Sequence, residues 1–167
     1  MAKLLYPLNE KHLQAFGGIV QQFARFERLI EIAVSAYLNN SAYTLTAMAL
    51  AGLGYSAKCD ALKSLIALSS ASEDDKEMFA AHVDDFNQYI SLRNGIAHHV
   101  WKEGTKPGTI KPMSVSARSG KGKIKGLKDD EPQYTEDELF RIHDVLIKLH
   151  DNFRGFLLTT GFMERML

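Results

Sequence analysis

Apolar residues recur at steps of three and four along most of the chain, which is the period of one face of an α-helix. The longest run extends from about Asn9 to Leu38 and carries Leu13, Phe16, Val20, Phe23, Ile30, Val34 and Tyr37. A second long run begins at Thr135, which with Glu138 has the spacing of a capping box, and ends near Gly161. These two runs predict long amphipathic helices.

Shorter helical patterns lie between the two long runs. One covers Tyr43 to Ala51, and another carries Leu62, Leu65, Ile66 and Leu68. A third begins at Ser72, which with Asp75 resembles a capping box, and its apolar stripe is Phe79, Val83, Phe86, Ile90 and Ala97. We expect this third helix to continue without a break into residues 91–101.

The helical period is lost between about residues 101 and 133, where glycine, proline, serine and lysine are frequent. Met113, Val115 and Ala117 alternate with polar residues ahead of a glycine-containing turn, which predicts a long loop or a short β-hairpin. The whole pattern predicts an all-α fold, a bundle of four to five helices with this insertion before the last helix.

Composition narrows the class of protein. The chain has 167 residues, 46% of them hydrophobic, which favours one domain spanning residues 1–167. Its formal net charge is zero, which excludes a uniformly basic scaffold for nucleic acid. Cys59 is the only cysteine, so a disulfide framework is excluded. No apolar run is long enough to span a bilayer and the N-terminus lacks a signal-peptide core, so we expect a cytoplasmic protein with no membrane partner.

Two charged residues interrupt the apolar stripes. Glu27 stands on the stripe of the first long helix, and Arg93 stands on the stripe that precedes the insertion. A buried charge is costly unless it is paired, so the pattern predicts that these two side chains meet. The alternative is that each stripe reaches the surface at this point and both charges are solvated.

Arg93 opens the segment RNGIAHH, which holds residue types suited to cutting RNA without a metal. A histidine titrates near neutrality and can take the proton of a 2′-hydroxyl or protonate the departing 5′-oxygen. An arginine can hold the phosphate, and Asn94 can orient the phosphate or a histidine. The alternative is that His98 and His99 are surface residues at a helix end.

The same segment resembles the signature of the HEPN superfamily, in which an arginine, often followed by a polar residue such as asparagine, is separated from a histidine by four to six intervening residues. The order of the predicted helices is also similar. The resemblance implies a helical bundle that dimerises through the motif helix and acts as a metal-independent endoribonuclease, without cofactor, in a toxin or antiviral defence system. It implies catalytic roles for Arg93, Asn94 and His98 or His99, with His98 in the commonest register. In this interpretation Glu27 is a carboxylate that fixes Arg93, and the alternative is that Glu27 belongs to an ordinary buried ion pair away from any site.

The insertion is locally basic although the chain is neutral. From Lys102 to Lys128 there are seven lysines and one arginine against the single acid Glu103. Such a patch can hold an RNA backbone, and a tryptophan beside it can stack on a base. The RNA-contact residues that we expect are Trp101, Lys102, Lys121, Lys123 and Lys125. The alternative is a solvated lysine-rich loop with Trp101 in a packing role.

Two hypotheses of different classes follow. The first is a homodimeric endoribonuclease with RNA as substrate and an antitoxin or defence-system protein as partner. The second is a non-catalytic HEPN-like module that binds a nucleotide or a partner protein. A metal site is not expected, because His143 and His150 share a helix face without a set of carboxylate ligands.

Overall fold

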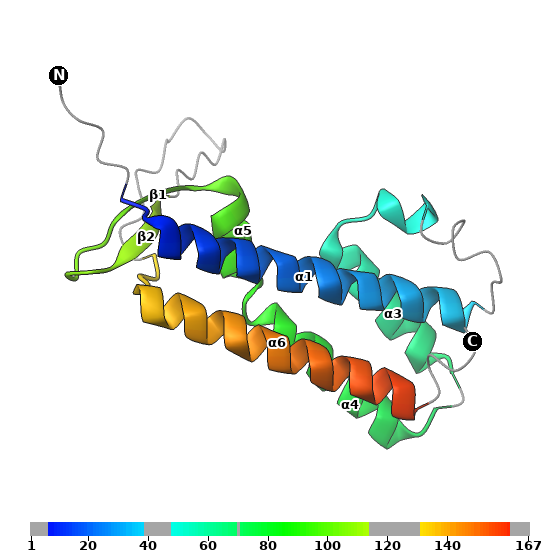
Figure 1. The fold of residues 1–167 in the computed structure, drawn as a ribbon. Coiled ribbons are helices and arrows are strands. Elements are labelled where there is room, and N and C mark those ends of the chain that lie inside the picture. Colours follow the sequence, from blue (N-terminus) through cyan, green and yellow to red (C-terminus); the bar gives the residue numbers. More distant parts are fainter. Residues whose placement is uncertain (1–6, 39–47, 70, 114–130, 161–167) are drawn as a thin grey trace, which may run out of the picture. The chain divides into compact units, whose positions relative to one another are not determined.

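The chain is mostly helical and contains a two-stranded antiparallel hairpin in its computed structural model (Figure 1). The structure describes residues 7–38, 48–69, 71–113 and 131–160. The elements are α1 (Glu10–Tyr37), α3 (Tyr55–Ala67), α4 (Glu73–Asn87), α5 (Ile90–His98), β1 (Val100–Glu103), β2 (Ile110–Met113) and α6 (Glu136–Thr159). Residues 48–51 are helical as well. The predicted fold class, an all-α bundle with a hairpin inserted before the last helix, is confirmed.

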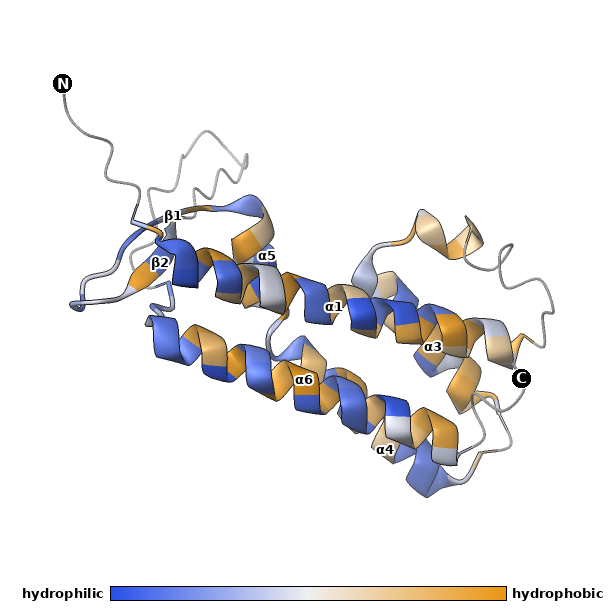
Figure 2. Cartoon of the chain, viewed as in Figure 1, coloured by the Kyte–Doolittle hydropathy of each residue, from blue (hydrophilic) through white to orange (hydrophobic). Residues whose placement is uncertain are grey.

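The chain divides into two compact units. Unit 1 contains Met1–Val20 and Ile90–Val145, and unit 2 contains Gln21–Tyr89 and Leu146–Leu167. The first parts of α1 and α6 therefore belong to unit 1, and their second parts belong to unit 2. Polar and apolar residues alternate along both helices (Figure 2), as their sequence period predicts. The single domain expected from the length of the chain stays a prediction.

Aromatic rings form the centre of unit 2. Phe26 of α1 stacks on Phe86 of α4 with 3.7 Å between ring centroids, and Phe153 of α6 lies 4.8 Å from Phe26. Phe23 meets Phe86 edge-on at 5.6 Å. All four side chains are almost completely buried, so this cluster joins α1, α4 and α6 by apolar contacts within the unit.

Unit 1 is centred on Trp101 of β1. The indole ring lies 4.6 Å from the ring of Phe16 on α1 and 6.2 Å from that of Tyr134. The hairpin pairs Trp101 with Pro112 and Glu103 with Ile110, and the turn between the strands uses a positive φ of 71° at Gly108, which favours glycine. The backbone of Tyr134 extends this small sheet by an antiparallel bridge to Ile110.

The starts of α1 and α6 lie side by side within unit 1. Asn9 caps α1, since its Oδ1 accepts from the backbone N–H of His12 at 3.0 Å, and its side-chain amide donates to the carboxylate of Glu136. The predicted capping box of α6 is also present: the backbone N–H of Thr135 donates to Glu138 at 2.7 Å, and the N–H of Glu138 donates to the Thr135 hydroxyl at 3.2 Å.

The prediction of one unbroken helix from Ser72 to the RNGIAHH segment is wrong. Ser72 caps α4, with its hydroxyl accepting from the N–H of Asp75, but α4 ends at Asn87, and the turn residues Gln88 and Tyr89 separate it from α5. The buried stripe also changes register, because α4 buries residues 79, 83 and 86 whereas α5 buries Leu92 and Gly95. Arg93 is therefore not on the buried stripe of its helix.

The hairpin that the structure describes precedes most of the alternating residues 113–117. Its strands are Val100–Glu103 and Ile110–Met113, so Met113 ends the second strand instead of starting the first. Val115 and Ala117 lie outside the described residues. The physical reason is that Trp101 and Ile110, which are buried, give the hairpin its apolar face.

Candidate functional site

The exposed end of α5 carries the polar residues of the RNGIAHH segment. Nη1 of Arg93 donates a hydrogen bond to Oδ1 of Asn94 at 3.0 Å. Asn94 and His98 are four residues apart on the helix and share one face, so this hydrogen bond draws the guanidinium towards the face of His98. Asn94, His98 and His99 are exposed and Arg93 is partly exposed. We call Arg93, Asn94, His98 and His99 the α5 cluster.

The two histidines of the α5 cluster have different surroundings. His98 is the last residue of α5. The backbone N–H of His99 donates to the carbonyl of Gly95 at 3.0 Å and closes the final turn. Nδ1 of His99 lies 3.8 Å from the place that a Cβ on Gly95 would occupy, so the His99 ring is close to the last turn of α5.

The side chain of Trp101 contacts the end of α5. Its Nε1 donates to the carbonyl of Gly95 at 3.2 Å, and the side chain is only 5% exposed. Because the indole is enclosed by Phe16 and Tyr134, its faces are not open to a nucleobase. The expectation that Trp101 stacks on RNA is therefore corrected, and its role is to fix the α5 cluster against the hairpin.

The lysines expected to contact RNA are only partly described. Lys102 lies in β1 and is half-buried. Lys121, Lys123 and Lys125 lie outside the described residues. Their contact with RNA stays a prediction from the sequence.

Glu27 belongs to unit 2 and has a partner that the sequence analysis did not identify. Nζ of Lys58 donates to Glu27 at 2.6 Å and to Glu31 at 2.8 Å, and the Lys58 side chain is 5% exposed. Burial lowers the pKa of Lys58, but the hydrogen bonds to Glu27 and Glu31 outweigh burial, so this pKa lies above its ordinary value. The pairing of Glu27 with Arg93 stays a prediction. Lys58 stands one turn before Leu62 on the buried stripe of α3, and this position in the sequence pattern is what could have indicated a buried lysine that needs a charged partner.

No group of three or more histidine, cysteine, aspartate or glutamate side chains is arranged to hold a metal among the described residues. His150 instead lies beside Asp151, with 3.1 Å between Nδ1 and Oδ1. Cys59 is buried, and burial raises the pKa of its thiol to about 11, which disfavours a nucleophilic thiolate. Within the ranges that the structure describes, no helix combines the length and the apolar character needed to cross a membrane.

Comparison with known proteins adds no family to this description. No protein-family model matches the chain, and no match is found among the curated proteins or the solved structures.

Proposed function

We propose that the protein is a metal-independent endoribonuclease and that the α5 cluster is its active site. The observation that carries the proposal is the hydrogen bond between Arg93 and Asn94, with His98 one turn further along the same exposed face. This arrangement presents a fixed cation for a phosphate and an imidazole that can transfer a proton on one exposed face of α5.

The reaction proceeds by attack of the ribose 2′-oxygen on the adjacent phosphorus. A histidine takes the proton of the 2′-hydroxyl, the bond between the 2′-oxygen and phosphorus forms, and the bond between phosphorus and the 5′-oxygen breaks. The same histidine, now protonated, gives that proton to the departing 5′-oxygen, leaving a 2′,3′-cyclic phosphate and a 5′-hydroxyl. Arg93 stabilises the charge that builds up on the non-bridging oxygens. Because Oδ1 of Asn94 accepts from Arg93, the amide nitrogen of Asn94 is the group that can donate to the phosphate.

In this proposal two copies of the chain meet through α5 and share the site, so that one copy supplies the arginine and the other the histidine. The exposed apolar residues Ala97 and Val100 beside the α5 cluster support such a contact, and the Val100 side chain is 62% exposed. A toxin or antiviral defence system, with a neutralising or defence-system partner, is the proposed setting.

The test is cleavage of labelled single-stranded RNA in EDTA by the wild type and by Arg93→Ala, His98→Ala and His99→Ala. Arg154→Ala is the matched control, since Arg154 is exposed on α6 outside the α5 cluster. We expect Arg93→Ala and one histidine variant to lose about a hundredfold or more in rate, with the fold retained. Equal cleavage by all variants, or none by the wild type, would contradict the proposal and favour the non-catalytic binding module.

Mixing two inactive variants tests the shared site. If Arg93 and His98 act across the dimer, Arg93→Ala and His98→Ala chains that exchange subunits form one intact site, and cleavage returns. If each chain holds a complete site, the mixed sample stays inactive and the composite arrangement is wrong.

A further inference from the structure

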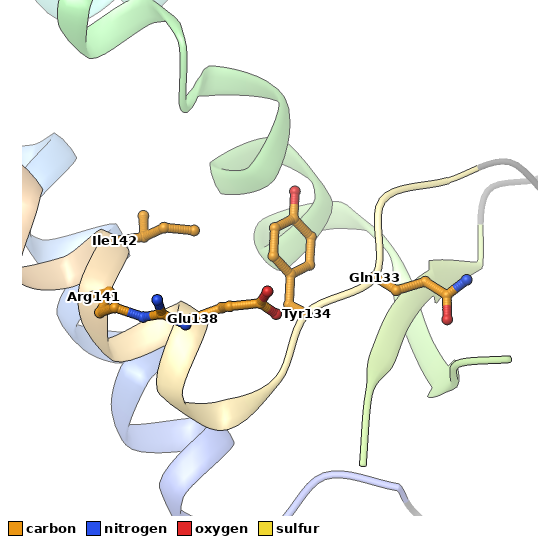
Figure 3. Close-up of a pocket in the computed structure, with 5 residues that line it drawn as sticks. All are labelled: Gln133, Tyr134, Glu138, Arg141 and Ile142. Atoms are coloured by element: carbon orange, nitrogen blue, oxygen red, sulfur yellow. The ribbon is translucent and has the colours of Figure 1, made fainter. Parts of the chain in front are cut away.

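A pocket that the proposed reaction does not use lies within unit 1, where the chain enters α6. Its volume is about 300 Å³, and it is lined by Gln133, Tyr134, Glu138, Arg141 and Ile142 (Figure 3). This volume is at the small end of the range for sites that hold small molecules. Figure 3 shows the Gln133 side chain pointing away from the other four, so those four decide what the pocket can bind.

Tyr134 forms a fixed aromatic wall of the pocket. Its backbone N–H and carbonyl both pair with Ile110 at 2.9 Å, and its ring packs against Trp101. Burial, followed by the nearby carboxylates of Glu131 and Glu138, raises the pKa of Tyr134, so its hydroxyl stays neutral. Ile142 contributes an apolar surface. An aromatic face with an apolar neighbour suits a flat ring such as a nucleobase.

Two charged side chains define the polar edge of the pocket. Oε2 of Glu138 accepts from the backbone N–H and the hydroxyl of Thr135, while Oε1 accepts no hydrogen bond from the described residues. Hydrogen bonds from Thr135, and then the charges of Arg141 and Lys106, keep the pKa of Glu138 below its ordinary value. Nε of Arg141 donates to the carbonyl of Asp137 at 3.3 Å, and its terminal nitrogens donate to none of the described residues.

A carboxylate oxygen and a guanidinium therefore stand three residues apart on one face of α6, beside an aromatic ring. Guanine matches this pair because its adjacent N1–H and N2–H groups can both donate to Oε1 of Glu138, and its O6 and N7 atoms can accept from the guanidinium of Arg141. Adenine lacks the neighbouring pair of donors, and the pyrimidines lack the second acceptor edge. We propose that this pocket binds a guanine base.

The pocket is linked to the α5 cluster inside the same unit. The Tyr134 ring contacts Trp101, and Trp101 holds the last turn of α5 through its hydrogen bond to Gly95. A guanine that packs on Tyr134 thus contacts the same residues, Tyr134 and through it Trp101, that hold the α5 cluster in place. The inference rests on the proposed ribonuclease only for the claim that the base belongs to an RNA strand, since a free guanine nucleotide presents the same ring.

The first experiment is a titration of the full chain with GMP, AMP, CMP and UMP, in which binding is measured by NMR or calorimetry. We expect GMP to bind about tenfold or more tightly than the others, which is the discrimination that one paired base contact provides. Arg141→Ala weakens GMP binding by a similar factor. Glu138→Gln removes the preference for guanine, and it keeps the capping box because glutamine serves the same capping role.

Arg154→Ala is the control and binds GMP as the wild type does. Absence of GMP binding at millimolar concentration, equal binding of all four nucleotides, or unchanged GMP binding by Arg141→Ala and Glu138→Gln would each overturn the proposal.

The second experiment maps where RNA is cut, and it separates this inference from the proposed function. Cuts at a fixed position relative to guanine, redistributed in Glu138→Gln, assign the pocket to a base of the RNA substrate. Guanine-specific binding of GMP without any cleavage keeps the pocket as a nucleotide site and refutes the ribonuclease. Cleavage that depends on Arg93, with no response to GMP, refutes the pocket alone.

Discussion

The guanidinium of Arg93 and the side-chain amide of Asn94 are hydrogen-bonded, with 3.0 Å between Nη1 and Oδ1. Neighbouring side chains on a helix point about 100° apart, so Arg93 starts from a different face of α5 than Asn94. The hydrogen bond turns its guanidinium towards the face that carries Asn94 and His98. Asn94 therefore orients Arg93 in the proposed reaction, in addition to the hydrogen bond that its amide nitrogen can donate to the phosphate.

Replacement of Asn94 by alanine tests that role. We expect Asn94→Ala to reduce the rate of RNA cleavage about tenfold or more, because Arg93 loses its fixed orientation, with little change in melting temperature at this exposed position. The measurement is single-turnover cleavage at saturating enzyme. Asn94→Asp keeps an acceptor for Arg93 but places a negative charge beside the phosphate, so it raises KM. An Asn94→Ala enzyme with the wild-type rate would remove Asn94 from the site.

The stack of Phe26 on Phe86 is expected to be the most sensitive contact of unit 2. Phe86→Ala leaves a cavity beside Phe26 and Phe23 and lowers the free energy of unfolding by about 3–5 kcal/mol, measured by urea denaturation. Leu68→Ala is the control, because Leu68 is 87% exposed and its loss changes stability by less than about 0.5 kcal/mol. Equal effects of the two substitutions would contradict the assigned core.

Lys58 is expected to stabilise unit 2 through its two carboxylate partners. Lys58→Met leaves Glu27 and Glu31 without their shared cation and lowers the free energy of unfolding by about 3 kcal/mol. The pKa of Lys58 is raised, so its contribution is complete below its ordinary pKa of 10.5 and disappears as pH rises through the higher folded value. Lys63→Met, which removes an exposed pair with Asp84, is the control and has a small effect. Similar losses in both variants would refute the prediction.

His82 is expected to make unit 2 sensitive to acid. Its ring lies 5.2 Å from Phe156 and 5.8 Å from Phe153, and burial lowers its pKa against the opposing influence of Asp85. The folded state favours the neutral ring, so stability is full above the ordinary pKa of 6.5 and falls as pH decreases from there towards the folded value. Melting curves should show a smaller loss in this range for His82→Leu than for the wild type. An identical pH profile would rule this histidine out.

Two adjacent glycines of α1 offer a matched pair in unit 1. A Cβ on Gly17 meets nothing within 4 Å, so Gly17→Ala gains about 1 kcal/mol from helix propensity. A Cβ on Gly18 would come within 2.6 Å of Cδ2 of His143, so Gly18→Ala forces that ring to move and is less stable than Gly17→Ala. Thermal unfolding compares the two variants. If Gly18→Ala is the more stable one, α1 and α6 do not meet in this way.

Residue periodicity predicts α1, α3, α4 and α6 but not the break between α4 and α5. Both sides of the break continue an acceptable apolar stripe, and neither Gly nor Pro stands at residues 88 and 89 to signal it. The change of register at Leu92 follows from packing in a different unit, which a local pattern does not contain. This is why periodicity alone places Arg93 on an apolar stripe.

The candidate site was predictable only where its residues are neighbours in the sequence. Arg93, Asn94 and His98 lie within two helical turns, so their shared location followed from the segment itself. The enclosure of Trp101 depends on Phe16 and Tyr134, which are distant in the chain. The proposed guanine pocket is harder to predict from the sequence. Tyr134, Glu138 and Arg141 follow a helical spacing, but Tyr134 precedes the start of α6.

The most direct test of the central claim is the fate of an RNA oligonucleotide and its all-deoxy counterpart, incubated in EDTA with the wild type and with His98→Ala and His99→Ala. The proposed reaction predicts that the wild type cuts only the RNA and leaves 2′,3′-cyclic phosphate ends, and that one histidine variant leaves it intact. Cleavage of the deoxy strand, or cleavage that neither histidine affects, would contradict an active site at the end of α5.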